Sequence, residues 1–194
     1  TRPHRLFGRD RETIDEAYPG DVVGLVNPGL FTIGDTLTSD PALTFDPIPH
    51  FAPECFGLLR TQDISKHKQF QKGLKQLEEE GVMQIFYSPD HVRREPVLAA
   101  VGELQFDVVM SRLENEYGVK TSVERLPHAL ARWIVGDPAT ISAVYWPSDT
   151  IRLVDQQGRG VMLFTTEHLL AYCIKSNPSI KFLLREEVEQ TSAQ

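Results

Sequence analysis

Acidic side chains at helical spacing are the first residues in this sequence that could take part in chemistry. Glu103 stands four positions before Asp107, and Glu78 to Glu80 form a continuous acidic run. Two carboxylates on one face of a helix could act as a general acid and a general base. Helical charge patterning explains both groups without catalysis, because charged residues are common on the exposed face of a helix. We therefore predict no catalytic role for these carboxylates.

The histidines and cysteines give no stronger signal. Six histidines are scattered along the chain: His4, His50, His67, His91, His128 and His168. Cys55 and Cys173 are far apart in the sequence and each has apolar neighbours, which favours two reduced, buried thiols. Motifs of the types GxxxxGK(S/T), HExxH, CxxC and GxSxG are absent from the sequence. We therefore predict no catalytic, cofactor-binding or metal-ligating residue, and we do not expect this chain by itself to be an enzyme.

Basic residues stand out against an acidic background. The sequence has 20 Lys and Arg against 27 Asp and Glu, a net charge of −7, and a pI near 5.4. This balance argues against a general nucleic-acid coat, including one for DNA, and leaves only local basic patches as RNA contacts. One patch is a row of lysines, Lys68, Lys72 and Lys75, opposite the apolar stripe of a predicted helix. A solvated helix face explains the same row, since Lys75 can pair with Glu79.

Arginines in predicted loops and near the start of the chain form a second group of candidates: Arg9, Arg11, Arg93 and Arg94. An acidic protein that approaches a polyanion must present its few unpaired cations. We therefore favour the arginines over the lysine row for RNA contact, and keep Lys68 and Lys72 as further candidates. Ordinary surface charge is the alternative interpretation of the arginines.

The elements that position these residues are clearest at one helix. The segment GELQFDVVMSRLENEYG, residues 102–118, begins and ends with glycine and is long enough for about four to five helical turns. Its apolar side chains share one stripe: Phe106, Val109, Met110, Leu113 and Tyr117. Leu104 and Val108 fall on the opposite side. We expect more of the chain, or a neighbouring domain, to cover that side.

The elements around this helix follow the order β-α-β-β-α-β. Strands are predicted over residues 55–60, 82–87, 96–101 and 120–125, and helices over residues 65–80 and 102–118. Ser65 is the expected N-cap of the first helix. This order predicts a ferredoxin-like unit, in which two helices cover one face of a four-stranded antiparallel sheet.

The flanking segments complete an α+β fold class. Residues 1–40 carry many turn residues and short strand-like runs at 5–7, 21–27 and 30–37, which predicts the terminal strands of a β-barrel domain whose beginning is absent. Prolines crowd residues 41–53, as in an extended linker. We predict one further domain over residues 54–194.

This further domain is predicted to have two parts, a ferredoxin-like βαββαβ unit over residues 54–125 and a small C-terminal α/β extension over residues 126–194. In the extension we predict strands over residues 130–135, 151–154, 161–165 and 180–184, and a helix over residues 167–176. No apolar run approaches the roughly 18 residues that span a bilayer, and no charged leader precedes one. We expect a soluble, intracellular protein without a membrane partner.

Four stretches, in this order, resemble the class II peptide chain release factors, a family of translational GTPases. They are FGRDRETIDEAYPGDVVGLVNPGLFTIGDTLT, PHFAPECFGLLRTQD with KQFQKGLKQLEEEGVMQIF, GELQFDVVMSRLENEYGV, and ARWIVG. Within the third stretch, Gln105-Phe106-Asp107 is more similar to this family than to elongation factor G, where a histidine commonly follows the leucine. The resemblance implies the end of the family's second, β-barrel domain followed by its third domain.

The resemblance also implies a function. The full-length family protein binds GTP or GDP with magnesium on an N-terminal G domain, docks on the rRNA and proteins of the ribosome in the cytoplasm, and promotes GTP-dependent release of class I release factors. This chain then corresponds to a non-catalytic C-terminal region that binds the ribosome in translation termination. Interdomain packing expected in such factors, including packing on the chain's own G domain, gives Leu104 and Val108 a candidate role as interdomain contacts.

Two other interpretations remain open. A fragment of an elongation factor G-like or ribosome-protection factor belongs to the same class, and such a chain is expected to continue into further domains. A stand-alone ferredoxin-like ligand-binding domain or enzyme, with a pocket assembled in space, belongs to another class. A small-molecule ligand or an intrinsic activity of the chain favours the latter.

Overall fold

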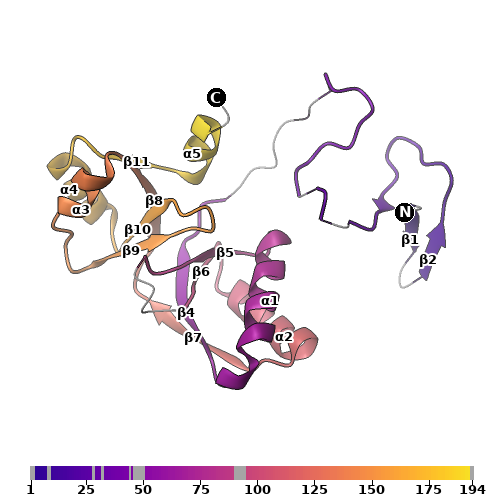
Figure 1. The fold of residues 1–194 in the computed structure, drawn as a ribbon, viewed down its shortest axis with the longest axis horizontal. Coiled ribbons are helices and arrows are strands. Elements are labelled where there is room, and N and C mark those ends of the chain that lie inside the picture. The colour runs from indigo at the N-terminus through magenta and orange to yellow at the C-terminus, as the bar shows by residue number, and fades with distance from the viewer. Residues whose placement is uncertain are drawn as a thin grey trace. The chain divides into compact units, whose positions relative to one another are not determined.

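The computed structural model describes residues 3–7, 10–27, 29–31, 33–43, 45, 51–89 and 95–192. Figure 1 shows the course of the chain. It divides into two compact units, an N-terminal unit of Thr1–Pro47 and a C-terminal unit of Ile48–Gln194. The predicted domain boundaries, including the linker at residues 41–53, stay predictions.

The N-terminal unit contains a small antiparallel sheet. Its strands are β1 (His4–Phe7), β2 (Asp10–Thr13) and β3 (Val23–Gly24), in the order β2-β1-β3. The polar strand β2 was not predicted, because DRET has no apolar alternation. The strand predicted over residues 30–37 is not found among the described residues of that range. One reason is that the Asn27 side chain accepts hydrogen bonds from the backbone N–H groups of Gly29 and Leu30, both at 2.9 Å, which favours a turn.

The first half of the C-terminal unit confirms the ferredoxin-like order, and we call it the first subdomain. Its elements are β4 (Cys55–Thr61), α1 (His67–Glu79), β5 (Gln84–Phe86), β6 (Val97–Ala100), α2 (Leu104–Tyr117) and β7 (Thr121–Leu126). The four strands form an antiparallel sheet in the order β5-β6-β4-β7. The α+β class predicted from the sequence is therefore confirmed.

The start of α1 differs from the prediction. Asp63, not Ser65, is the capping residue, because its Oδ1 accepts a hydrogen bond from the backbone N–H of Ser65 at 2.9 Å. Its cap precedes a short 3-10 helix, Ile64–Lys66, that leads into α1. Aspartate and serine cap helices about equally well. The sequence alone therefore left the choice between them open.

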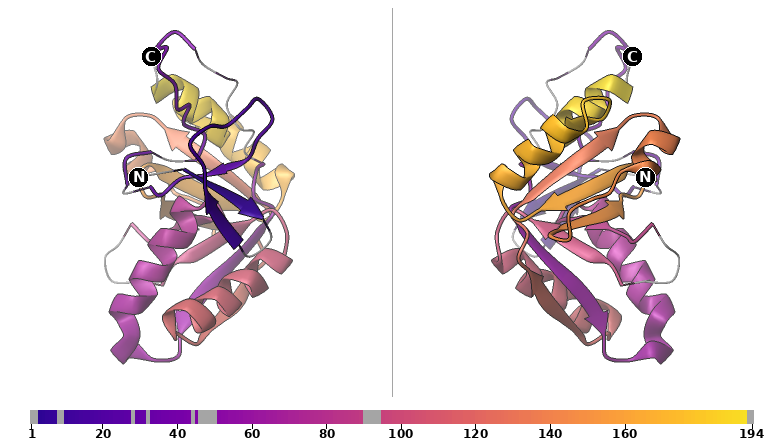
Figure 2. Two further views of the ribbon diagram at one scale, coloured as in Figure 1. Left: turned by 90° about the vertical axis from the view of Figure 1, so that its right-hand side faces the viewer. Right: turned by 90° about the vertical axis from the view of Figure 1, so that its left-hand side faces the viewer.

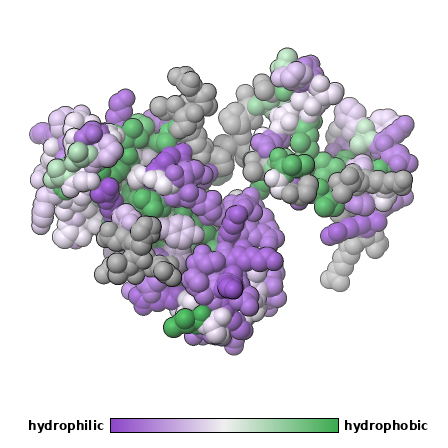
Figure 3. Space-filling model, in the orientation of Figure 1, coloured by the Kyte–Doolittle hydropathy of each residue, from purple (hydrophilic) through white to green (hydrophobic). Residues whose placement is uncertain are grey.

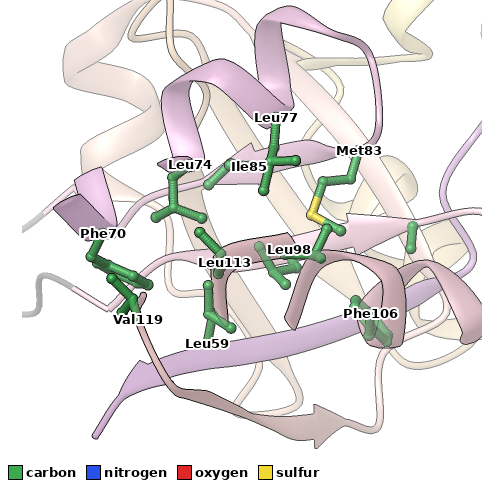
Figure 4. Packing of buried hydrophobic residues seen from close by; sticks show 12 residues of the cluster. Leu59, Phe70, Leu74, Leu77, Met83, Ile85, Leu98, Phe106, Leu113 and Val119 are labelled. Atoms are coloured by element: carbon green, nitrogen blue, oxygen red, sulfur yellow. The ribbon is translucent and has the colours of Figure 1, made fainter. Parts of the chain in front are cut away.

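The core of the first subdomain lies between its helices and its sheet. Leu74 of α1, Leu113 of α2 and Leu59 of β4 are fully buried, and Figure 4 shows them gathered in one cluster. The two helices approach closely at Gly73, where a Cβ atom would lie 2.7 Å from Leu113 Cδ2. Burying a leucine side chain contributes about 1.5–3 kcal/mol. The predicted stripe of α2 is therefore the side that holds this subdomain together.

The second half of the C-terminal unit repeats the same topology, and we call it the second subdomain. Its elements are β8 (Leu130–Val135), α3 (Pro138–Ala143), β9 (Thr150–Val154), β10 (Gly160–Phe164), α4 (Glu167–Ser176) and β11 (Lys181–Leu183). The strand order β11-β8-β10-β9 matches that of the first sheet when each is counted from its own first strand. A final helix, α5 (Arg185–Ser192), follows. The small α/β extension is thus a second βαββαβ unit.

The two subdomains pack sheet against sheet. Phe86 of β5 meets Trp133 of β8 edge to face, with ring centroids 5.8 Å apart, inside an apolar cluster shared by both sheets and by Val188 of α5. The other side of the second sheet is covered by α3 and α4, through Ile141 and Leu170. The C-terminal unit therefore has helices outside and two sheets inside, as Figures 1 and 2 show.

Candidate functional site

The part of the chain that the structure describes contains no group of three or more His, Cys, Asp or Glu side chains that could hold a metal ion. A search of the same residues for helices that are long and apolar enough to cross a membrane also finds none. The candidate sites described below are surfaces and polar clusters.

The predicted lysine row lies on the outer side of α1. Phe70, Leu74 and Leu77 are buried on its inner side, whereas Lys68 and Lys72 are exposed. Figure 3 shows a hydrophilic surface over this helix. Lys75 Nζ lies 3.6 Å from Glu79 Oε1, as the solvated interpretation of the row expects.

Lys68 and Lys72 differ from Lys75, since neither forms an ion pair with a carboxylate of the described residues. Several other cations of the first subdomain are paired. Arg112 of α2 pairs with Glu80, at the end of α1, at 2.5 Å and with Glu116 of its own helix at 2.6 Å. Arg60 pairs with Glu124 at 2.9 Å. This internal pairing narrows the set of side chains able to meet a phosphate.

The structure describes only one of the four predicted arginines. Arg11 is exposed on β2 of the N-terminal unit. Arg9, Arg93 and Arg94 lie outside the described residues. Among the described candidates, Lys68 and Lys72 lie together on α1, and the RNA contacts stay predictions.

The second flank of α2 is apolar and exposed in this chain. Leu104 is 78% exposed and Val108 is 48% exposed. Val101, at the end of β6, is 46% exposed and was not singled out from the sequence. We call these three residues the α2 flank. Next to them, Arg125 lies 4.4 Å above the Phe106 ring and 3.7 Å from Glu103.

A polar cluster at the junction of the two subdomains was also missed. Asp155 is only 7% exposed, and its Oδ2 accepts hydrogen bonds from Trp133 Nε1 at 2.8 Å and Arg159 Nε at 2.7 Å. Its Oδ1 accepts from the backbone N–H of Gln157 at 3.0 Å and of Arg159 at 2.9 Å. These four donors compensate the burial of the carboxylate. In the sequence, the pair Gln157-Gly158 between the predicted strands 151–154 and 161–165 indicates a turn here but no polar cluster.

Glu78, in the last turn of α1, faces this cluster. Its Oε1 accepts a hydrogen bond from the backbone N–H of Ile85 at 3.3 Å, and its Oε2 accepts one from Gln156 Nε2. Burial raises the pKa of Glu78 to about 7, although both hydrogen bonds and the charge of Arg185 lower it in part. The carboxyl therefore changes its charge near neutral pH.

Comparison with known proteins covers most of the chain. Residues 45–174 match the family described as class II release factor RF3, C-terminal domain. Residues 1–40 match the family described as elongation factor G domain 2. The two matches follow each other without overlap. They agree with the order of segments predicted from the sequence.

Similar proteins carry the name peptide chain release factor 3. The protein from Nostoc punctiforme is 48% identical over 181 residues, which cover 93% of this chain and 33% of the relative. The Synechococcus elongatus protein is 49% identical over 93% of this chain and 33% of its own length. That of Gloeobacter violaceus is 48% identical over 94% of this chain and 34% of its own length. The chain spans about a third of the length of these curated relatives.

Proposed function

Because the chain belongs to the class II release factor family, we propose that it is the non-catalytic C-terminal region of a translational GTPase that binds the ribosome in translation termination. The observation that carries this proposal is the family match over residues 45–174. In the full-length protein, GTP or GDP with magnesium is bound by a separate N-terminal G domain. The region described above helps that domain promote the release of class I release factors in the cytoplasm.

The chemistry of ribosome binding rests on cations that can displace the counterions of rRNA phosphates. Lys68 and Lys72 suit this role in the first subdomain, because they are exposed and lack a carboxylate partner among the described residues. Arg11 suits it in the N-terminal unit. Arg9, Arg93 and Arg94 complete the proposed set on the sequence argument alone.

The α2 flank is proposed to contact the G domain of the same protein. Exposed apolar residues that lie close together are common at docking surfaces. Leu104 and Val108 project from one side of α2, away from the buried stripe, and leave it open to a neighbour. Covering both side chains stabilises docking by an amount on the order of 1.5–3 kcal/mol for each one that becomes fully buried.

The proposal is tested by a chimera in which this chain replaces the matching third of the Nostoc punctiforme relative. We expect the chimera to bind ribosomes, measured by co-sedimentation across a salt series. Replacing Lys68 and Lys72 together by glutamine should weaken binding and flatten its salt dependence. Lys75→Gln is the matched control, because Lys75 already pairs with Glu79.

The arginines are tested in the same chimera by replacing Arg93 and Arg94 together with glutamine. A weaker affinity and a flatter slope are expected if the pair meets phosphates. An unchanged slope and affinity remove that pair from the interface. A chimera that fails to bind ribosomes at low salt contradicts the proposed function itself, and points to the stand-alone ligand-binding or enzymatic alternative.

The absence of a phosphate-binding loop from the sequence also predicts that the chain alone does not bind guanine nucleotides. Calorimetry at micromolar concentrations of the chain and of GTP is the measurement. Detectable binding contradicts the assignment of nucleotide chemistry to a separate domain.

A further inference from the structure

The two subdomains are joined at one corner by backbone hydrogen bonds between strands of different sheets. Tyr87, just after β5, donates its N–H to the carbonyl of Val154 at 2.8 Å, and Val154 donates back to Tyr87 at 2.8 Å. This antiparallel bridge links the edge strands β5 and β9. The shared apolar cluster lies behind it. The corner is therefore a hydrogen-bonded junction between the two sheets.

The turn between β9 and β10 is fixed in shape beside this bridge. Asp155 accepts hydrogen bonds from the backbone N–H groups of Gln157 and Arg159, and Gly158 adopts a φ of +77°. Glycine takes that conformation without a steric cost. The Asp155 carboxylate also accepts hydrogen bonds from Trp133 Nε1 and Arg159 Nε. The turn is thus a rigid support that presents Gln156 to its neighbour.

That neighbour is Glu78. It belongs to the first subdomain, but its two carboxyl oxygens bind groups of both subdomains, the Ile85 N–H and the Gln156 side-chain amide. Two charged groups act on the carboxyl from the elements around it, Asp155 of the turn and Arg185 at the start of α5. The charge of Glu78 acts in turn on Tyr87 after β5, and Arg159 of the turn pairs with Asp155. On α1 itself, Lys75 pairs with Glu79 and is directed away.

We propose that Glu78 and the β9–β10 turn form a proton-sensitive clasp between the two subdomains, closed when the Glu78 carboxyl is neutral and loosened when it is ionised. A neutral carboxyl keeps a hydrogen bond to each subdomain. Its carbonyl oxygen accepts from the Ile85 N–H, and its hydroxyl donates to Gln156 Oε1 once the Gln156 side-chain amide, which presents Nε2 to the carboxyl in the structure, turns over. An ionised carboxyl places an incompletely solvated charge near the buried Asp155 carboxylate, and separation of the corner returns it to water.

The raised pKa of Glu78 determines how the stability of the closed corner depends on pH. The folded pKa of about 7 lies above the ordinary value of 4.5. The stabilising contribution is therefore fully present below about 4.5 and is lost as the pH rises through about 7. The pKa of Tyr87 is raised to about 12 by burial and then by the charge of Glu78. Within this corner, Glu78 is accordingly the group that responds near neutral pH.

Nuclear magnetic resonance of the whole chain tests the site directly. We expect the Ile85 amide and the Gln156 side-chain amide to shift together as the pH is raised from 5 to 9, with a midpoint near 7. Both shifts should be flat in Glu78→Gln, which is neutral at every pH. Glu79→Gln is the matched control, since it removes the adjacent exposed carboxylate, and it should retain the wild-type midpoint. A wild-type midpoint below about 5 would overturn the proposal.

Amide hydrogen exchange tests the opening. After correction for the intrinsic exchange rate, protection of the Tyr87 and Val154 amides should fall by up to about tenfold between pH 6 and pH 8 in the wild type, the limit that the shift of Glu78 sets. It should stay constant in Glu78→Gln. Gln156→Ala keeps the carboxyl but removes its contact on the turn, so it should lower protection at both pH values. Equal pH dependence in the wild type and Glu78→Gln would show that another group controls the corner.

Discussion

Replacement of Leu113 by alanine probes the side of α2 that organises the first subdomain. Leu113 is fully buried in a cluster with residues of α1, β4 and β6. The substitution removes about three methyl or methylene groups, which is about 2.4 kcal/mol at roughly 0.8 kcal/mol for each. The cavity left behind adds on the order of 1–2 kcal/mol. We expect the free energy of unfolding to fall by about 3–5 kcal/mol.

We expect the loss of stability for Leu113→Ala to lie in the upper part of this range, because the surrounding residues cannot readily move in to fill the cavity. Gly73 faces Leu113 and has no side chain to refill the space. The two helices are also held at their present distance by the hydrogen bond from Tyr117 Oη to Gln76 Oε1 at 2.7 Å and by the Arg112–Glu80 ion pair at 2.5 Å. Relaxation of α1 toward α2 would disturb both contacts.

Urea unfolding of the whole chain, followed by far-ultraviolet circular dichroism, measures this loss. Leu104→Ala is the matched control, because the same residue type stands on the same helix but is 78% exposed. It should change the free energy of unfolding by less than about 0.5 kcal/mol. Gly73→Ala should destabilise the wild type and cost less with Leu113→Ala, since the contact with Leu113 at 2.7 Å is gone and only those with Tyr117 at 3.0 Å remain. A loss under about 1 kcal/mol for Leu113→Ala would refute the assigned buried face.

Three further predictions follow from single contacts. Gly57→Ala should lower the free energy of unfolding by about 1–3 kcal/mol in urea titrations, because the new Cβ would lie 2.4 Å from Val123 Cγ1. Asp155→Ala should lower the free energy of unfolding by about 3–5 kcal/mol, because Trp133 and Arg159 lose a shared buried hydrogen-bond acceptor. Urea unfolding followed by tryptophan fluorescence measures this loss. Between pH 5 and pH 8, the wild type should lose about 1–2.5 kcal/mol relative to Glu78→Gln, since the folded pKa of Glu78 is about 7.

Much of the fold follows from local patterns in the sequence. The α2 stripe, the near-continuous apolar strand ending at Ala100 and the Asn177-Pro178 stop after α4 each leave a clear periodic or punctuating signal. Two short helices of the second subdomain were missed. Asp137 and Pro138 cap and begin α3, a recognisable start signal, whereas α5 is polar apart from the buried Val188. Its position depends on tertiary packing, which no local pattern encodes.

The candidate site was less predictable than the fold. Exposure of Lys68, Lys72, Leu104 and Val108 follows from helical periodicity alone, since each lies away from a buried stripe. The corner at Glu78 could not be foreseen, because it joins residues about 80 positions apart through the packing of two sheets. In the sequence, Glu78 was one member of an acidic run whose other members are exposed.

We propose above that this chain supports the termination function of a class II release factor once it is joined to a G domain. The most direct measurement is the rate at which the chimera with the Nostoc punctiforme relative releases a bound class I release factor from ribosomes after peptide release. Release should be faster with GTP than with GDP, and the GTP effect should be lost when the matching third is deleted. A chimera that binds ribosomes but leaves the release rate unchanged with GTP would contradict the proposed function.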